Sequence, residues 1–110
     1  RFYDAIDPQG KKVEFKKQAG LQWIDIYKLS QLSDQEKRIT ILFFVHEDGA
    51  IVDIYETNYK KLIKVMGVGG WDLRAINKLY ERDGISDSIQ MKSPLKLSKI
   101  QDFKLIWKRP

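Results

Sequence analysis

The strongest constraint on the fold is a turn signature close to the start of the sequence, Asp7-Pro8-Gln9-Gly10. Proline at the second position fixes its own backbone angle, and glycine at the fourth supplies the left-handed residue of a bulged three-residue connection. We expect Asp7 to shape this turn through its side chain rather than to bind a metal. Residues 2–7 and 11–17 then form the two strands of a β-hairpin.

A bulge at Gly10 determines which residues face each other across this hairpin. It places Asp4 opposite Glu14, with their Cβ atoms about 4.5–5.5 Å apart on the same side of the sheet. Lys16 lies two residues beyond Glu14 and therefore shares that side. The residues of the opposite side are all apolar: Tyr3, Ala5, Val13 and Phe15. We expect the hairpin to pack this apolar side into the core and to present Asp4, Glu14 and Lys16 together on the other side.

Two carboxylates and a lysine in this arrangement suit metal-dependent hydrolysis. Ionised Asp4 and Glu14 repel each other unless a cation lies between them. Mg²⁺ binds oxygen ligands, often one or two carboxylates with water and a phosphate oxygen, and the carbonyl of Phe15 could add another. The metal would activate water and offset charge in the transition state of phosphodiester hydrolysis. Lys16 could orient the attacking water, act on its proton or steady the phosphate, and the sequence leaves these three roles open.

The same residues resemble the PD-(D/E)XK nuclease signature. The run Asp4-Ala5-Ile6-Asp7, the Gly10 turn and the run Glu14-Phe15-Lys16 are similar in spacing to the motif of small Pvu-type type II restriction endonucleases. The segments that follow are also similar in outline: an apolar strand, a tight turn, a strand ending near Ile54-Tyr55 and a lysine-rich helix. The resemblance is most specific over residues 3–16.

The resemblance implies an α/β (α+β) fold, with a restriction-endonuclease-like mixed sheet, flanking helices and the catalytic β-hairpin near the N-terminus. It implies a homodimer that cleaves double-stranded DNA at a short recognition sequence with Mg²⁺ as cofactor. Asp4 and Glu14 would be metal ligands and Lys16 the catalytic lysine. Family members normally carry a helix and a strand before this hairpin. We therefore expect residues 1–110 to be a single nuclease-like domain that lacks an upstream N-terminal segment.

Downstream of the hairpin, the sequence predicts a mixed α+β domain with a mainly antiparallel sheet. Residues 38–46 and 50–56 are predicted as two strands around a turn. The apolar run Ile41–Val45 is typical of a central strand that is covered on both faces. Residues 18–37 fit neither a helical nor a strand period, apart from a capping box at Ser33–Glu36 that opens a short helical turn.

Two helices and an extended tail are expected in the rest of the chain. Thr57 or Asn58 can cap a helix over residues 59–66, which Gly67 ends. A second helix is predicted within residues 72–84. Apolar residues at period two predict extended structure in the tail, between residues 89 and 107.

Basic residues and amides supply candidates for DNA contacts. The net charge of +5 permits an anionic partner without demanding one. Three lysines of the first predicted helix form either a solvated face or phosphate contacts: Lys60, Lys61 and Lys64. Three residues that follow the predicted active-site residues of this strand could read base edges, since glutamine pairs with adenine and lysine with guanine: Lys17, Gln18 and Gln22. The tryptophans are expected in the core rather than as stacking platforms: Trp23, Trp71 and Trp107.

Composition sets the remaining limits. A chain of 110 residues forms one domain at most, and its longest strictly apolar run, Ile41–Val45, is too short to cross a bilayer. The absence of cysteine leaves no disulfide framework and no thiolate metal site, which favours a cytoplasmic location.

A type II restriction endonuclease is the leading hypothesis for the function. The alternatives are a Holliday-junction or repair nuclease with the same site, a basic DNA-binding module without catalysis, and a small protein-interaction domain.

Overall fold

The structure, a computed structural model, describes residues 3–66 and 92–110. The helix predicted within residues 72–84, Trp71 and the start of the predicted tail lie outside the described residues. The elements are β1 (Ala5–Ile6), β2 (Lys12–Gln18), β3 (Leu21–Asp25), α1 (Ile26–Ser30), the 3₁₀ helix η1 (Glu36–Arg38), β4 (Thr40–Glu47), β5 (Ala50–Asn58), α2 (Tyr59–Val65), β6 (Lys92–Lys96), α4 (Leu97–Ile100) and β7 (Lys104–Lys108). None of the helices in this part of the chain has the length and apolar character needed to cross a membrane.

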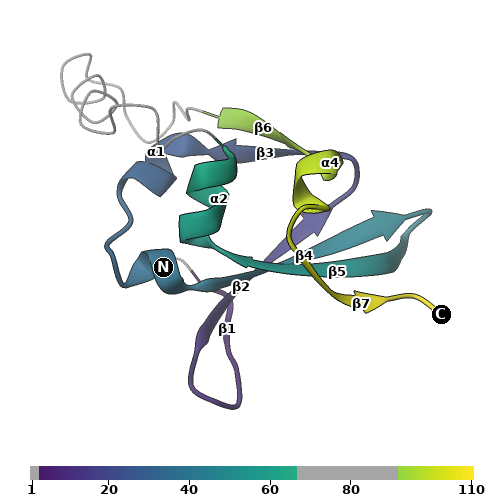
Figure 1. The fold of residues 1–110 in the computed structure, drawn as a ribbon, viewed down its shortest axis with the longest axis horizontal. Helices are drawn as coiled ribbons and strands as arrows, with labels where there is room; N and C mark the ends of the chain where they lie inside the picture. The colour runs from purple at the N-terminus through teal and green to yellow at the C-terminus, as the bar shows by residue number, and fades with distance from the viewer. Residues whose placement is uncertain (1–2, 67–91) are drawn as a thin grey trace.

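The strands form two sheets (Figure 1). Five strands make a mixed sheet in the order β1-β2-β4-β5-β7, and β3 pairs with β6 in a separate two-stranded ribbon. Within the described residues, β2 and β4 are parallel and the other strand pairs are antiparallel. The chain crosses from β2 to β4 through β3, α1 and η1. The prediction of a mixed α+β fold with a mainly antiparallel sheet is confirmed.

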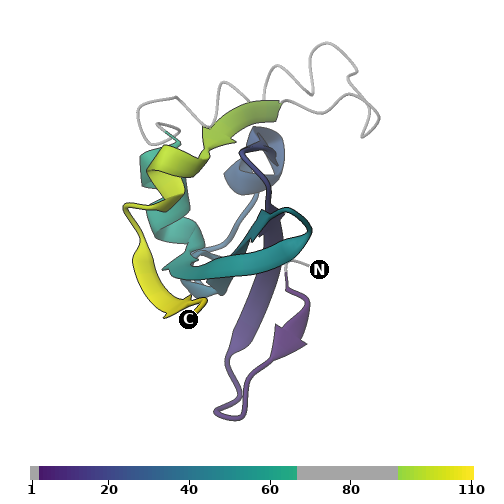
Figure 2. The same ribbon diagram turned by 90° about the vertical axis from the view of Figure 1, so that its right-hand side faces the viewer.

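The helices and the β3–β6 ribbon lie over one face of the five-stranded sheet (Figure 1, Figure 2). On that face Ile41, Phe43 and Val45 of β4 are buried in one cluster with side chains of α1, α2 and α4. The alternate residues Leu42 and Phe44 are only half-buried. Within residues 3–66 and 92–110 the covering elements all lie on one side, so the predicted cover of this strand is confirmed for that face alone.

The turn of the first hairpin has the predicted form. β1 pairs with β2 in the expected register, and Gly10 has a φ of +81°. Asp7 Oδ1 accepts hydrogen bonds from the backbone N–H groups of Gln9 (2.9 Å) and Lys11 (2.8 Å). The turn-shaping role of Asp7 is confirmed, although the first strand is limited to the two residues of β1. Both views show the hairpin projecting beyond the rest of the sheet (Figure 1, Figure 2).

The orientation of β2 differs from the expectation. Its parallel register with β4 sets Glu14 and Lys16 beside fully buried residues of that strand, on the covered face of the sheet. Phe15 points to the other face, where its side chain is 45% exposed and contacts the ring of Phe44 edge-on. Val13 is buried as expected, but the predicted burial of Phe15 is wrong. Glu14 and Lys16 consequently lie at the margin of the core instead of on an open surface.

Local signals in the middle of the chain are confirmed. Ser33 and Glu36 exchange the two hydrogen bonds of a capping box, 3.0 and 3.1 Å long, at the start of η1. Asn58 Oδ1 accepts a hydrogen bond of 2.9 Å from the backbone N–H of Lys61 and caps α2. β4 and β5 are joined by a tight turn whose two residues have positive φ. Gly67, which was predicted to end α2, lies outside the described residues.

The tail contains a short helix, α4, that the period-two pattern did not predict. Ile100 of this helix is fully buried. Trp107 of β7 is 42% exposed, and Trp23 of β3 is 56% exposed. The prediction that these two tryptophans are core residues is therefore wrong. Each lies on a strand at the edge of its sheet, where one side of the strand pairs with no other strand among the described residues.

Candidate active site

Three predicted site residues meet beside the first hairpin. Asp4 directly precedes β1, and its Oδ2 accepts a hydrogen bond of 2.8 Å from the backbone N–H of Phe15. The Glu14 carboxyl lies within hydrogen-bonding reach of the Asp4 carboxyl. Lys16 Nζ lies 3.8 Å from Glu14 Oε1. The fold thus brings Asp4, Glu14 and Lys16 together at the margin of the covered face.

Partial burial perturbs the charges of this group. The side chains of Glu14 and Lys16 are 17% and 21% exposed. Burial raises the pKa of Glu14 and the Asp4 carboxylate raises it further, whereas Lys16 and Lys28 oppose the change. Burial likewise lowers the pKa of Lys16, and the nearby Lys28 adds to this, while Glu14 and Asp4 oppose it. Two adjoining carboxylates in such a setting favour the binding of a further cation.

The backbone carbonyl of Phe15 adds a third oxygen-bearing group, beside the two carboxylates, to this edge of the hairpin. The N–H and C=O of one residue in an extended strand point to the same side. Because the Phe15 N–H donates to Asp4, its carbonyl also faces the Asp4 side of β2. The available donors are therefore two carboxylates and one carbonyl, all hard oxygen ligands of the kind that Mg²⁺ prefers.

This donor set fits Mg²⁺ better than a metal that needs a full cage of side chains. The described residues contain no group of three or more His, Cys, Asp or Glu side chains that could hold a metal ion. Mg²⁺ is commonly bound through one or two carboxylates and keeps its remaining positions for water and phosphate oxygens. Asp4, Glu14 and the Phe15 carbonyl match that requirement.

A cavity of about 290 Å³ adjoins the candidate metal site. Lys16 of β2 forms one part of its wall, and residues of β3, α1, the segment after α1 and α2 form the rest. Its polar and aromatic lining comprises Lys16, Trp23, Asp25, Lys28 and Tyr59. Asp25 Oδ1 accepts a hydrogen bond of 3.2 Å from the backbone N–H of Lys28, so this carboxylate also caps α1. The cavity carries two ammonium groups against one carboxylate.

Tyr59 connects this cavity with the carboxylates. Its side chain is buried, and burial raises the pKa of its phenol, with Glu14 and Asp4 raising it further. The hydroxyl therefore remains protonated throughout the physiological pH range.

Lys28, Tyr59 and Trp23 were not among the predicted site residues. Tyr59 has the spacing of the apolar face of α2, and burial alone explains that pattern. Trp23 and Lys28 lie in the segment for which neither period was clear. Their approach to Lys16 depends on how the crossover folds over β2, which no local motif encodes.

The three residues predicted to read bases lie in different environments. Lys17 is exposed on the face of β2 opposite Lys16. Gln18 is fully buried, and its Nε2 donates hydrogen bonds to the backbone carbonyls of Gly20 and Leu95. Gln22 is half-buried with its Oε1 enclosed. An amide enclosed like that of Gln18 cannot reach a DNA groove, and it instead ties β2 to β6.

The lysines of α2 are exposed, and two of them line a different cavity. Lys60, Lys61 and Lys64 all lie on the solvent side of the helix. Lys61 and Lys64 line a cavity of about 550 Å³ together with Lys99 and Phe103, and it shares no lining residue with the cavity beside Lys16. They remain candidates for phosphate contacts away from the carboxylates.

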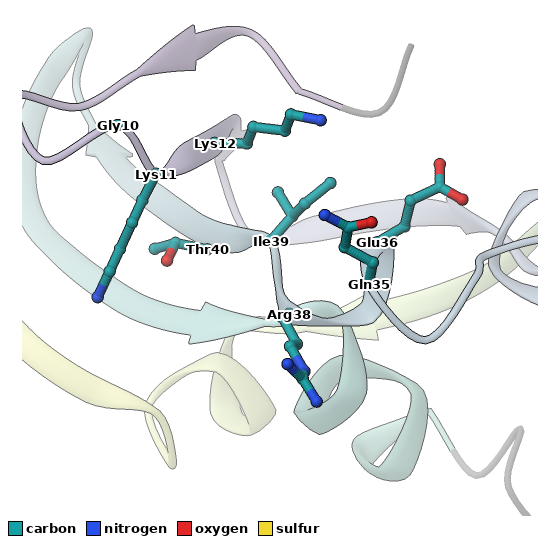
Figure 3. Close-up of a pocket in the computed structure, with 8 residues that line it drawn as sticks. All are labelled: Gly10, Lys11, Lys12, Gln35, Glu36, Arg38, Ile39 and Thr40. Carbon is teal, nitrogen blue, oxygen red and sulfur yellow. The ribbon is translucent and has the colours of Figure 1, made fainter.

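A third cavity, of about 480 Å³, lies between the hairpin and η1. Lys11, Lys12 and Arg38 line it together with Glu36. Figure 3 shows the three basic side chains splayed in different directions rather than directed at one point. This arrangement suits a general attraction for anions better than a specific ligand site.

A search with models of known protein families finds no match to this chain, and a search of curated proteins finds none either. The functional assignment therefore depends on the side chains that the fold brings together.

Proposed function

We propose that this protein is a Mg²⁺-dependent endonuclease that hydrolyses phosphodiester bonds in DNA. Asp4 and Glu14 are the metal ligands and Lys16 is the catalytic lysine. The observation that carries this proposal is the meeting of two carboxylates with an ammonium group 3.8 Å from one of them, at the margin of a covered sheet face. The spacing of these residues and the mixed sheet that holds them support a restriction-endonuclease-like fold.

Each residue has a distinct part in this mechanism. Asp4 is held in place by the Phe15 N–H, so one carboxylate oxygen is oriented before any ligand arrives. Glu14 and the Phe15 carbonyl complete the protein ligands. Bound Mg²⁺ would lower the pKa of a water molecule and offset negative charge on the phosphate. Lys16 donates hydrogen bonds to the attacked phosphate or to the attacking water, which positions the nucleophile.

The resemblance favours a type II restriction endonuclease, a cytoplasmic homodimer that acts on a short double-stranded sequence. One observation favours a second candidate, a junction or repair nuclease with the same chemistry. Trp23 is exposed at the cavity beside Lys16, and an exposed aromatic ring can stack on a base that is not paired in a duplex.

Incubation with plasmid, oligonucleotide and branched DNA tests these proposals. We expect Mg²⁺-dependent cleavage that is lost in Asp4→Asn and in Lys16→Ala. The matched control is Asp34→Asn, which alters an exposed carboxylate that lies outside the hairpin and pairs with Lys37. Discrete plasmid fragments identify a restriction enzyme, and cleavage of branched DNA alone identifies a junction nuclease. Binding without cleavage, unchanged in both site variants, contradicts catalysis and favours a DNA-binding module.

A further inference from the structure

Trp23 lies exposed on β3, a strand at the edge of the β3–β6 ribbon. Its side chain is 56% exposed, although a tryptophan gains more from burial than any smaller apolar residue. The ring also lines the cavity that contains Lys16. An exposed aromatic ring beside a cationic cavity is an arrangement that nucleic-acid-binding proteins use to stack bases next to bound phosphates.

The charges of the cavity suit a phosphate group. Lys16 and Lys28 both line it against one carboxylate, Asp25, whose Oδ1 also accepts the backbone N–H of Lys28. The volume of about 290 Å³ lies at the lower end of the range for small-molecule sites, which suits a single nucleotide unit. The cavity also borders the carboxylates through Lys16, so a phosphate held there lies next to the candidate metal ligands.

We propose that this cavity binds an unpaired nucleotide of a DNA strand, with its base stacked on Trp23 and its phosphate held by Lys28 and Lys16. Bases within a duplex are covered on both faces by their neighbours, so only an unpaired or terminal base can lie against the ring. The inference rests on the proposed nuclease function and, of the two candidates given there, favours the junction or repair nuclease over the restriction endonuclease. The preferred substrate is single-stranded DNA or the unpaired region of a branched or frayed duplex.

Binding without catalysis tests this inference separately from cleavage. A fluorescent single-stranded oligonucleotide, a blunt duplex of matched length and a mononucleotide competitor are titrated in EDTA and followed by anisotropy. We expect the wild-type protein to bind the single strand at least about tenfold more tightly than the duplex. Trp23→Ala should weaken single-strand binding roughly tenfold, the loss typical of one stacked base, and should leave duplex binding unchanged.

Matched variants separate stacking and charge from general effects. Trp107→Ala removes a tryptophan of similar exposure from β7 and should leave binding unchanged. Lys28→Ala should weaken single-strand binding and reduce its salt dependence, whereas Lys104→Ala, at an exposed position of β7, should have no effect. Trp23→Phe keeps an aromatic ring and should retain most of the affinity, which keeps the test valid if Trp23→Ala unfolds.

Several results would overturn the inference. The first is that Trp23→Ala binds the single strand as tightly as the wild type does. The second is that Trp23→Ala weakens duplex binding as much as it weakens single-strand binding. The third is that the wild type binds neither DNA. Displacement of the strand by a mononucleotide at the same concentration as the oligonucleotide would identify a free-nucleotide site instead. The two proposals fail differently. Absence of Mg²⁺-dependent cleavage overturns the nuclease, whereas cleavage that is unaffected in Trp23→Ala overturns only the nucleotide site.

Discussion

Glu14 is held in the fold at a cost in stability. Its carboxylate is mostly buried beside Asp4, and both conditions raise its pKa, which means that the folded protein disfavours the ionised form. Groups perturbed in this way gather at functional sites, where a cation or substrate completes the charge balance. The same group therefore connects metal binding with the stability of the metal-free protein.

We expect Glu14→Gln to raise the melting temperature of the metal-free protein near neutral pH, because the variant buries no carboxylate charge. For the wild type, the favourable contribution of protonated Glu14 is complete below its ordinary pKa of 4.5 and is lost as pH rises through the raised folded-state value. The difference between variant and wild type should therefore grow as pH rises from about 5 to about 8. Thermal unfolding in EDTA, followed by circular dichroism, measures it.

The control for this prediction is Glu47→Gln, which changes an exposed carboxylate at the end of β4 and should leave the melting temperature unchanged. Added Mg²⁺ should stabilise the wild type and not the Glu14→Gln variant. A lower melting temperature for Glu14→Gln across the whole pH range would show that the carboxylate stabilises the fold.

At the scale of elements, α2 depends on its cap. Asn58 accepts a hydrogen bond from the Lys61 N–H, and the helix that follows places Tyr59 beside the carboxylates. We expect Asn58→Ala to lower the free energy of unfolding by about 1 kcal/mol, measured by urea titration. Asn58→Asp keeps an accepting oxygen and should retain most of the stability. Equal losses in the two variants would contradict the capping role.

Elements defined by local chemistry could be predicted from the sequence. The Asp7 turn, the capping box at Ser33 and the Asn58 cap each depend on residues a few positions apart, and the structure has all three. The carboxylate pair and Lys16 follow from the register of one hairpin, so their meeting could also be predicted.

The sequence could not predict which face of β2 packs against the core, because a strand distant in the sequence, β4, determines it. The crossover that makes β2 and β4 parallel has no local signature, and it sets Glu14 and Lys16 on the core side and Phe15 on the outer side. The same crossover brings Lys28 and Trp23 to the cavity beside Lys16. Hydrophobic alternation in β2 fits either orientation, since each face of the strand holds residues that can be partly buried.

At the scale of the whole molecule, positive charge is distributed over separate surfaces. The net charge is +5, and basic residues line three of the cavities, which lie between the hairpin and η1, beside Lys16, and between α2 and α4. Long-range attraction of DNA is a property of this whole distribution, whereas cleavage depends on one part of it.

We expect the double variant Lys61→Ala, Lys64→Ala to bind duplex DNA more weakly and with a lower salt dependence. Each lost phosphate contact should reduce the slope of log affinity against log salt by about 0.9. The control Lys104→Ala, Lys108→Ala removes the same charge from exposed positions of β7. Titrations of duplex DNA at several salt concentrations compare the affinities of the two double variants. Equal decreases in slope for the two double variants would mean that net charge, rather than contact by α2, governs binding.

The most direct test of the proposed active site compares neighbouring lysines on opposite faces of one strand. Lys16 lies beside Glu14, and Lys17 points away from it. The measurement is the rate of Mg²⁺-dependent cleavage of a labelled DNA under single-turnover conditions. We predict a loss of about 10²- to 10³-fold for Lys16→Ala and almost none for Lys17→Ala. Equal rates for Lys16→Ala and the wild type, or no cleavage by the wild type in Mg²⁺, would contradict a nuclease site at this hairpin.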